Sequence, residues 1–299
     1  LCMASTPSYN PNKIIQKPNK EYWDSILENE LSPLTYRCIQ GLYAPGSTFK
    51  MVVAIAGLVH GVIGTDTKHF CSGKIGLGDR LYHCWKNNGH GLMNVSDAIK
   101  ESCDVFFYEI SKKIGIDKIA QVAEDFGLGK IYEVPLPNQK KGIIPSRDWK
   151  KKKYDESWYP GETLISAIGQ GFVLTNPLQL AVMTSIIASN GKNVKPNIIK
   201  QNNQIEFEKL EKYQNAIKII KNSMFKVVNE NKGTAYNSRS AYAPFAGKTG
   251  TSQVRRITVA ERESEDFRKK EIEWKKRDHA LFVGYMPLEK PKYAVSVVT

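Results

Sequence analysis

The sequence predicts an α+β fold, in which helices pack on an antiparallel sheet. Helical patterns recur between residues 47 and 227. Strand-like runs at 242–254, 280–286 and 293–299 then follow one another without a helix between them, which favours antiparallel pairing. The 299 residues are 41% hydrophobic and 24% charged, which is typical of a globular protein and excludes a disordered or multi-pass membrane chain.

Each helix is predicted from its apolar spacing and from the residues at its ends. The run that follows Pro45 and Gly46 is apolar nearly all round and begins at Ser47, so we expect a buried helix over 47–58. Gly115 ends one helix and Pro177 begins another. The other predicted helices cover 21–30, 94–101, 105–114, 117–127, 177–191 and the region of 217–227, whereas 65–91 is glycine-rich and has no helical period.

The two ends of the chain carry further expectations. Residues 1–5 are strand-like, so we expect them to join the sheet. The charged segment 255–277 is interpreted either as a flap beside the strand at 242–254 or as a solvated insertion. Because the chain starts at Leu1 and stops within a strand-like run, we interpret it as a fragment of a longer protein. Its longest apolar run, 51–59, is too short to cross a bilayer.

The formal net charge of +13 favours anionic partners. The lysine runs at 140–141 and 150–153 are interpreted as a solvated face or, alternatively, as attraction to an anionic lipid surface. They do not form the aromatic-studded patch that nucleic-acid binding requires, so we expect no nucleic-acid partner.

A serine and a lysine three residues apart form the first candidate catalytic pair. On a helix, Ser47 and Lys50 share one face, so the Lys50 amine is expected to reach the Ser47 hydroxyl. Serine needs a base to become a nucleophile, and a dehydrated lysine can accept its proton. A helix start also offers free N–H groups to a developing oxyanion. This spacing alone is weak evidence, because it occurs by chance in most proteins.

Two further motifs gain weight beside the first. Lys248, Thr249, Gly250 and Thr251 lie in a predicted strand, where the lysine can hold a carboxylate and the glycine permits close backbone approach. Elsewhere, Ser102, Cys103 and Asp104 place a hydroxyl and a carboxylate two residues apart, where both can face one cleft. Alone, each motif is equally well read as ordinary structure.

Three cysteines and a histidine form a candidate metal site. Cys71, Cys84, His90 and Cys103 match a common structural Zn²⁺ ligand set, and the first three lie in the glycine-rich segment, which has no core of its own. The alternative is a Cys71–Cys84 disulfide with a buried Cys103 thiol. His69 and His83 are rival imidazoles, and no role follows for Cys2 and Cys38.

Taken in chain order, 47–50, then 102–104, then 248–251, the three motifs are those of penicillin-binding proteins and serine β-lactamases, a set already documented for that superfamily. The chain resembles the penicillin-binding protein 2 family, the class B transpeptidases of bacterial cell elongation, over nearly its whole length. The segments that carry the resemblance are 43–50 (YAPGSTFK), 101–108 (ESCDVFFY), 169–171 (GQG), 175–179 (TNPLQ), 246–251 (AGKTGT) and 277–282 (RDHALF).

The resemblance implies one transpeptidase domain over 1–299, with an antiparallel sheet flanked by helices and an all-helical lobe of roughly 60–200 inserted between sheet-forming segments. It implies that Ser47 attacks the D-Ala-D-Ala carbonyl of a stem peptide, with Lys50 as proton acceptor and Ser102 as a relay toward the leaving amine. Asp104 would orient Lys50 or the substrate. The remaining implied roles are carboxylate binding by Lys248 and Thr249, a cleft lined by Gly250, Thr251, Gly169 and Gln170, and an oxyanion hole made by the N–H groups of Ser47 and Thr251.

The resemblance also implies an inner-membrane anchor, a periplasmic location, and partners at the membrane. These partners are stem peptides, a lipid-linked precursor, β-lactams, a membrane glycosyltransferase and elongation scaffold proteins. Members of the family resemble this chain in having metal ligands at matching positions, so Zn²⁺ is expected to support the loop that carries Ser102 and Asp104. Asp104 stands where the broader superfamily has Asn, and an Asp there favours a charged Lys50.

Two other functions stay open. A hydrolase of the same superfamily, either a β-lactamase or a D,D-carboxypeptidase, would deacylate with water, although no recognisable glutamate motif for that step is present. A non-catalytic penicillin sensor would keep the same fold. Trp85, Trp149 and Trp158 either line a substrate groove or pack as ordinary aromatic residues.

Overall fold

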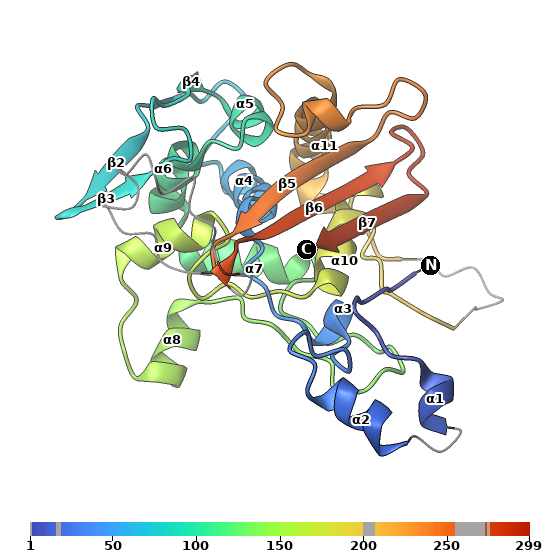
Figure 1. The fold of residues 1–299 in the computed structure, drawn as a ribbon. Coiled ribbons are helices and arrows are strands. Elements are labelled where there is room, and N and C mark those ends of the chain that lie inside the picture. Colours follow the sequence, from blue (N-terminus) through green and yellow to red (C-terminus); the bar gives the residue numbers. More distant parts are fainter. Residues whose placement is uncertain (1, 16–18, 200–206, 255–272, 274–275) are drawn as a thin grey trace.

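A three-stranded antiparallel sheet lies at the centre of the fold (Figure 1). The computed structural model describes residues 2–15, 19–199, 207–254, 273 and 276–299. The strands are β5 (Ala246–Ser252), β6 (His279–Met286) and β7 (Tyr293–Val298), in the order β5-β6-β7. Thr249 pairs with Phe282, and Val283 pairs with Ser296. The three strands predicted from the sequence are therefore confirmed, with β5 at an edge of the described sheet.

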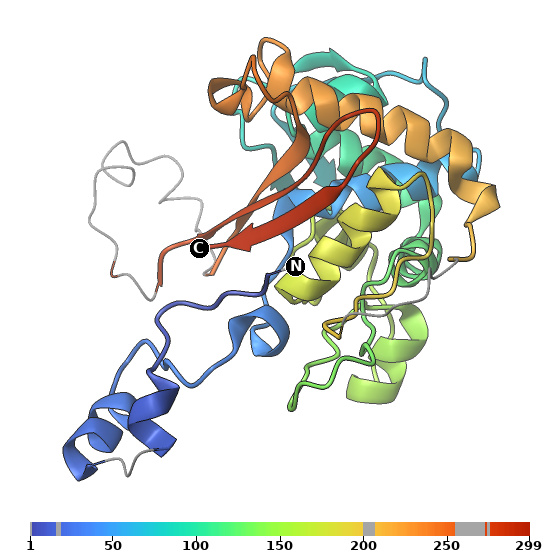
Figure 2. The ribbon, with the colours of Figure 1, turned by 90° about the vertical axis from the view of Figure 1, so that its right-hand side faces the viewer.

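Two helices cover one face of this sheet, as Figure 2 shows. α10 (Pro177–Ala188) packs against β6 and β7, and α11 (Gln214–Asn229) packs against β5. The apolar residues that predicted α11 are all buried in the structure: Ile217, Ile220, Met224 and Val227. Asn176 caps α10 by accepting a hydrogen bond from the Gln179 N–H, and Pro177 occupies its first turn.

The remaining helices build the lobe beside the sheet and an N-terminal projection. α4 (Lys50–Val59) is buried along nearly its whole length, because it is apolar on every side. The lobe contains α5 (Val95–Lys100), α6 (Asp104–Ile114), α7 (Ile116–Asp125), α8 (Arg147–Tyr154) and α9 (Pro160–Ala167). The projection contains α1 (Pro11–Ile15) and α2 (Lys20–Leu27), and α3 (Arg37–Gln40) follows (Figure 1); the 3₁₀ turns are η1 (Gly46–Thr48), η2 (Glu211–Tyr213) and η3 (Tyr236–Ser238).

The glycine-rich segment contains four short strands that sequence reasoning did not predict. β1 (His69–Cys71) pairs with β4 (Gly91–Met93), and β2 (Lys74–Leu77) pairs with β3 (Arg80–His83). Each has only three or four residues, too few for an alternating pattern to be recognised. The interval 60–200 therefore holds two small sheets beside its helices, so the expectation of an all-helical lobe is wrong.

The N-terminal residues depart from their prediction. Residues 2–5, the described part of the predicted strand at 1–5, form no strand. Their contacts run instead to the loop that begins α3: the Ser5 hydroxyl donates to the Thr35 carbonyl, and the Cys38 thiol donates to the Ala4 carbonyl. These hydrogen bonds each use a side chain, and the backbone of this segment does not pair with a neighbouring strand. The insertion predicted at 255–277 lies almost entirely outside the described residues.

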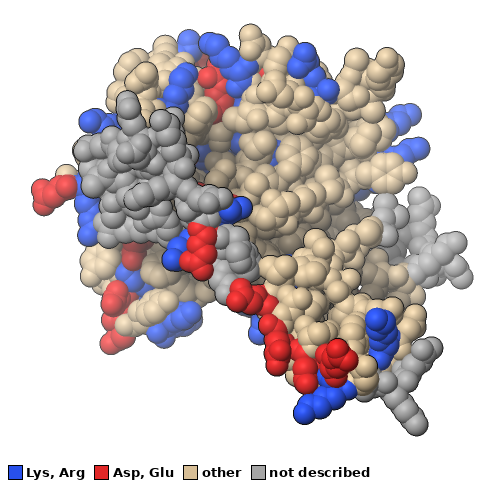
Figure 3. All heavy atoms as spheres, viewed as in Figure 1, with Lys and Arg blue, Asp and Glu red and all other residues tan. Residues whose placement is uncertain are grey.

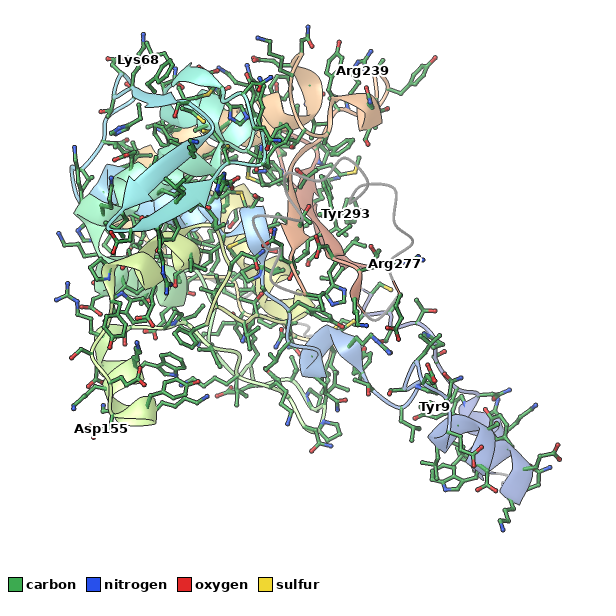
Figure 4. The ribbon with its side chains drawn as sticks, turned by 60° about the vertical axis from the view of Figure 1, so that its left-hand side comes forward. Tyr9, Lys68, Asp155, Arg239, Arg277 and Tyr293 are labelled. Carbon is green, nitrogen blue, oxygen red and sulfur yellow. The ribbon has the colours of Figure 1, made fainter. Side chains whose placement is uncertain are left out.

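Lysines of the helix α8 form salt bridges with nearby carboxylates. Lys150 is 2% exposed and lies 2.6 Å from the Glu162 carboxylate. Lys151 pairs with Asp155, which Figure 4 places at the far end of α8. On the face shown in Figure 3, lysines and arginines are scattered among other residues and do not gather into one patch. No helix within the described ranges is both long and apolar enough to span a bilayer.

Candidate active site

The turn that carries Ser47 is packed directly against strand β5. Gly46 has a φ of +53°, and a Cβ atom there would lie 2.3 Å from the Thr251 carbonyl oxygen. Only glycine permits both this backbone conformation and this approach. The Gly46 N–H donates to the Gly169 carbonyl, 3.0 Å away. Ser47 therefore lies between the end of β5 and the bend at Gly169.

Lys50 stands at the start of α4 with a fully buried amine. Its Nζ donates to the Asp104 carboxylate at 2.6 Å, to the Ser102 carbonyl at 2.8 Å and to the Ser102 hydroxyl at 3.3 Å. The Lys50 and Asp104 side chains are 0% and 12% exposed. The short contact between a buried amine and a carboxylate favours an ion pair between Lys50 and Asp104.

This arrangement corrects one expectation about the nucleophile. Among the described residues, the acceptors of Lys50 Nζ belong to Ser102 and Asp104, and the Ser47 hydroxyl is not one of them. The two residues also belong to different elements, because the helix expected from Ser47 begins only at Lys50 and Ser47 lies in the preceding 3₁₀ turn η1. The Asp104 carboxylate attracts the amine more strongly than a neutral hydroxyl does, and so directs it toward α6.

A second lysine approaches the same hydroxyl from the sheet. Lys248 Nζ lies 3.1 Å from Ser102 Oγ and 3.0 Å from the Thr249 carbonyl oxygen. Burial lowers the pKa of Lys248 well below its usual value, and the positive charge of Lys50 lowers it further, whereas Asp104 acts in the opposite direction. The Ser102 hydroxyl is thus held between two amines from different parts of the fold.

The predicted substrate-binding residues surround this centre. Along β5, Thr249 is half-buried and Thr251 is exposed, whereas Gly250 packs under Thr48 and Pro45. The Gln170 amide donates to the Thr251 carbonyl at 3.1 Å, which ties the bend at 169–170 to the strand. The structure therefore brings together all the residues singled out in the three motifs.

Two participants were not identified by sequence reasoning. The Thr234 hydroxyl lies 2.6 Å from that of Thr249 and is exposed to the cleft side of β5. Nothing in the sequence marks Thr234, because lone hydroxyls are common. Trp85 was considered only as a groove or packing residue, yet both of its N–H groups donate to the loop 101–104. Trp149 packs against Phe172 and Tyr154, in an aromatic cluster with Trp158.

The predicted metal ligands also converge. The ligand atoms of Cys71, Cys84, His90 and Cys103 lie within 4.8 Å of one another, so the group could hold a metal ion. His90 Nδ1 is 3.6 Å from Cys71 Sγ and 3.5 Å from Cys84 Sγ. All of the cysteines are free, so the structure contains no Cys71–Cys84 disulfide. A hydrogen bond from Cys103, with another from His90, lowers the pKa of Cys84, which favours a thiolate there.

Comparison with known proteins places this site in a family. The family model of the penicillin binding protein transpeptidase domain matches residues 1–299. The chain belongs to this transpeptidase family. This match, with the similarity to solved PBP2 structures described below, confirms the predicted fold class and the resemblance to penicillin-binding protein 2.

Named relatives and solved structures agree with the family. The transpeptidase chain is 34% identical to the peptidoglycan D,D-transpeptidase MrdA of Acinetobacter baumannii over 313 residues, which cover 100% of this chain and 45% of that protein. It is similar to the penicillin-binding protein PBP2 of Helicobacter pylori, with a TM-score of 0.88, 33% identity and coverage of 99% of this chain and 52% of the other. The same PBP2 in complex with MreC gives a TM-score of 0.89, 33% identity and the same coverage. The transpeptidase chain thus spans about half the length of these relatives.

The lowered pKa of Lys248 makes a prediction about stability. Between that lowered pKa and the unfolded value near 10.4, the unfolded chain binds a proton that the native chain does not, so stability rises with pH. Burial of the charged form costs about 1.4 kcal/mol for each unit by which the native pKa lies below the unfolded one. Urea unfolding at pH 8 and pH 10 should show the wild type gaining more stability than Lys248→Met. The exposed Lys292→Met is the control, and equal gains in all three proteins would refute the account.

Proposed function

We propose that this chain is the catalytic part of a peptidoglycan D,D-transpeptidase in which Ser47 forms an acyl-enzyme with a D-Ala-D-Ala stem peptide. One observation supports the proposal most: the Ser102 hydroxyl lies between the amines of Lys50 and Lys248, beside a strand edge that packs on the Ser47 turn. Acyl transfer needs a nucleophile, a proton path and amide donors in one place, and these elements supply all three.

The proton path starts from the resting ion pair. Lys50 holds its proton against Asp104, so it must release that proton before it can accept one from Ser47. The Ser102 hydroxyl touches both amines and can pass a proton from Lys50 to the neutral Lys248 amine. Arrival of a substrate carboxylate beside Lys248 favours its ammonium form, so substrate binding itself promotes this transfer.

The neutral Lys50 amine then takes the Ser47 hydroxyl proton while the oxygen attacks the carbonyl carbon. The N–H groups of Ser47 and Thr251 stabilise the oxyanion, since Gly46 packs directly on the Thr251 peptide. When the tetrahedral intermediate collapses, the C–N bond breaks and Ser102 delivers a proton to the departing D-Ala amine. The lysines restore the proton of Ser102.

The substrate carboxylate is bound along β5. Lys248 contributes charge, and the paired hydroxyls of Thr249 and Thr234 contribute hydrogen bonds. Gln170, Gly169, Gly250 and Thr251 shape the adjoining wall. A stem-peptide amine then attacks the acyl-enzyme, which forms the crosslink, and β-lactams acylate Ser47 in place of the substrate.

The wider setting is proposed on the same basis. Residues 1–299 form one transpeptidase domain of a longer, inner-membrane protein that faces the periplasm, with the lobe of roughly 60–200 between the sheet-forming segments. Its partners are stem peptides, the lipid-linked precursor, a membrane glycosyltransferase and an elongation scaffold. The complex of a similar PBP2 with MreC supports a partner of the last kind.

We also propose that Cys71, Cys84, His90 and Cys103 hold a structural Zn²⁺. Tetrahedral coordination with Zn–S near 2.3 Å and Zn–N near 2.0 Å places S and N about 3.5 Å apart, which agrees with the 3.5 and 3.6 Å observed from His90. The burial of all three sulfurs also suits a closed structural site. The metal would supply stability to the segment 69–93, and the residues of the active site carry the chemistry.

Acylation at Ser47 is tested by intact mass after exposure to benzylpenicillin. The wild type should gain the mass of one β-lactam, and Ser47→Ala should gain none. The control Ser185→Ala, a serine of α10 whose hydroxyl bonds within the helix, should label like the wild type. Adduct that persists for hours, with crosslinking of donor and acceptor stems, supports the transpeptidase.

Rapid loss of the adduct with hydrolysed product would favour the hydrolase. Stable labelling without any crosslinking of stems by the longer protein would favour the sensor.

Metal content tests the zinc proposal. The wild type and the buried-cysteine control Cys38→Ala should each hold about one zinc per chain, and Cys71→Ala should lose it. Because a structural metal contributes directly to folding, a strong chelator should lower the melting temperature by several degrees and slow acylation. Native mass two daltons below the reduced chain, without metal, would instead establish a disulfide.

A further inference from the structure

Trp85 follows Cys84 directly and uses both of its N–H groups on the loop that carries two active-site residues. Its indole N–H donates to the Ser102 carbonyl at 3.0 Å and to the Glu101 carbonyl at 3.1 Å. Its backbone N–H donates to Asp104 Oδ2 at 2.9 Å. Because the side chain is 56% exposed, burial of its ring does not explain this position.

The acceptors of Trp85 are the groups that hold Lys50. Lys50 Nζ donates to the same Ser102 carbonyl oxygen, at 2.8 Å, and to the other carboxylate oxygen of Asp104, at 2.6 Å. Among the described residues, every hydrogen-bond acceptor of the Lys50 amine therefore belongs to Ser102 or Asp104, the two residues that Trp85 binds. A shift of Trp85 would move the whole set.

Ser102 needs such support because its backbone is in an unfavourable conformation. Its φ is +57°, in the left-handed region that residues other than glycine rarely adopt. Surrounding contacts must hold a residue in this conformation. Two donors, the indole and the Lys50 amine, converge on its carbonyl oxygen, and its hydroxyl is thereby aimed between Lys50 and Lys248.

Trp85 also joins this loop to the Cys/His cluster. Its ring packs edge-on against His90, with centroids 5.3 Å apart. In the reverse direction, the Asp104 N–H donates to Cys84 Sγ at 3.3 Å. The loop 101–104 is thus joined to the cluster through Cys103, which belongs to both, through Cys84, and through the contact of Trp85 with His90.

We propose that Trp85 is a positioning residue for acylation: its indole and backbone N–H groups fix the Ser102 carbonyl and the Asp104 carboxylate around Lys50, and so transmit the order of the Cys/His cluster to the proton path. The proposal rests on the proposed function. It assigns the indole N–H an effect on the chemical step and none on the initial binding of the ligand.

The test separates that N–H from the rest of the side chain. Trp85→Phe keeps an aromatic ring and the backbone donor, and benzothienylalanine at position 85 replaces only the indole N–H by sulfur. Trp23→Phe, on the distant helix α2, is the control. Stopped-flow labelling with a fluorescent penicillin measures the dissociation constant before acylation, the acylation rate constant and the labelled fraction, and the metal content is assayed on each sample.

Both changes at position 85 should slow the acylation rate constant about ten-fold, as expected when one hydrogen bond to a charged network is lost. The dissociation constant, labelled fraction and metal content should match those of Trp23→Phe and the wild type. An unchanged rate constant would overturn the proposal, and so would weaker initial binding alone, which would make Trp85 a ligand contact. A reduced labelled fraction with a normal rate would indicate a folding role. If the wild type is not labelled at all, the proposed function fails instead.

Discussion

The buried amine of Lys50 is the constraint on which the rest of this site depends. A lysine at the start of an apolar helix cannot stay charged in the interior without a partner, because desolvation of an unpaired ammonium costs several kcal/mol, roughly 3–5 kcal/mol when a partner is removed. Asp104 and the Ser102 carbonyl supply that partner from α6 and the loop before it. The need to pair this charge therefore brings the start of α4 and the start of α6 together.

The second lysine, Lys248, supplies the other end of the proposed proton path. Lys248 reaches the same hydroxyl from β5, but the only carboxylate within the described centre is already paired with Lys50. Burial and the like charge of Lys50 both disfavour the ammonium form of Lys248. In the proposed mechanism, these two amines and the hydroxyl between them form the path along which a proton moves when a substrate carboxylate arrives.

Sequence reasoning predicted the sheet, most of the helices and the residues of the three motifs that converge here, because these features leave local signals. Ser47 and Lys50 have helical spacing, and the glycines at 46 and 250 mark the close approach of turn and strand. The direction of the Lys50 amine did not follow from local spacing, since it depends on a carboxylate 54 positions away, and only the family resemblance suggested Asp104 as its partner. The short strands of 69–93 carry no period, and the contacts of Trp85 and Thr234 arise only from tertiary packing.

The Lys50–Asp104 pair can be tested most directly by a double-mutant cycle on the free energy of unfolding, with Lys50→Met, Asp104→Asn and the double variant. If the pair organises the site, each single change strands a buried group, and the double variant recovers part of the loss, with a coupling energy above about 1.5 kcal/mol. Additive losses, within about 0.5 kcal/mol, would contradict the account.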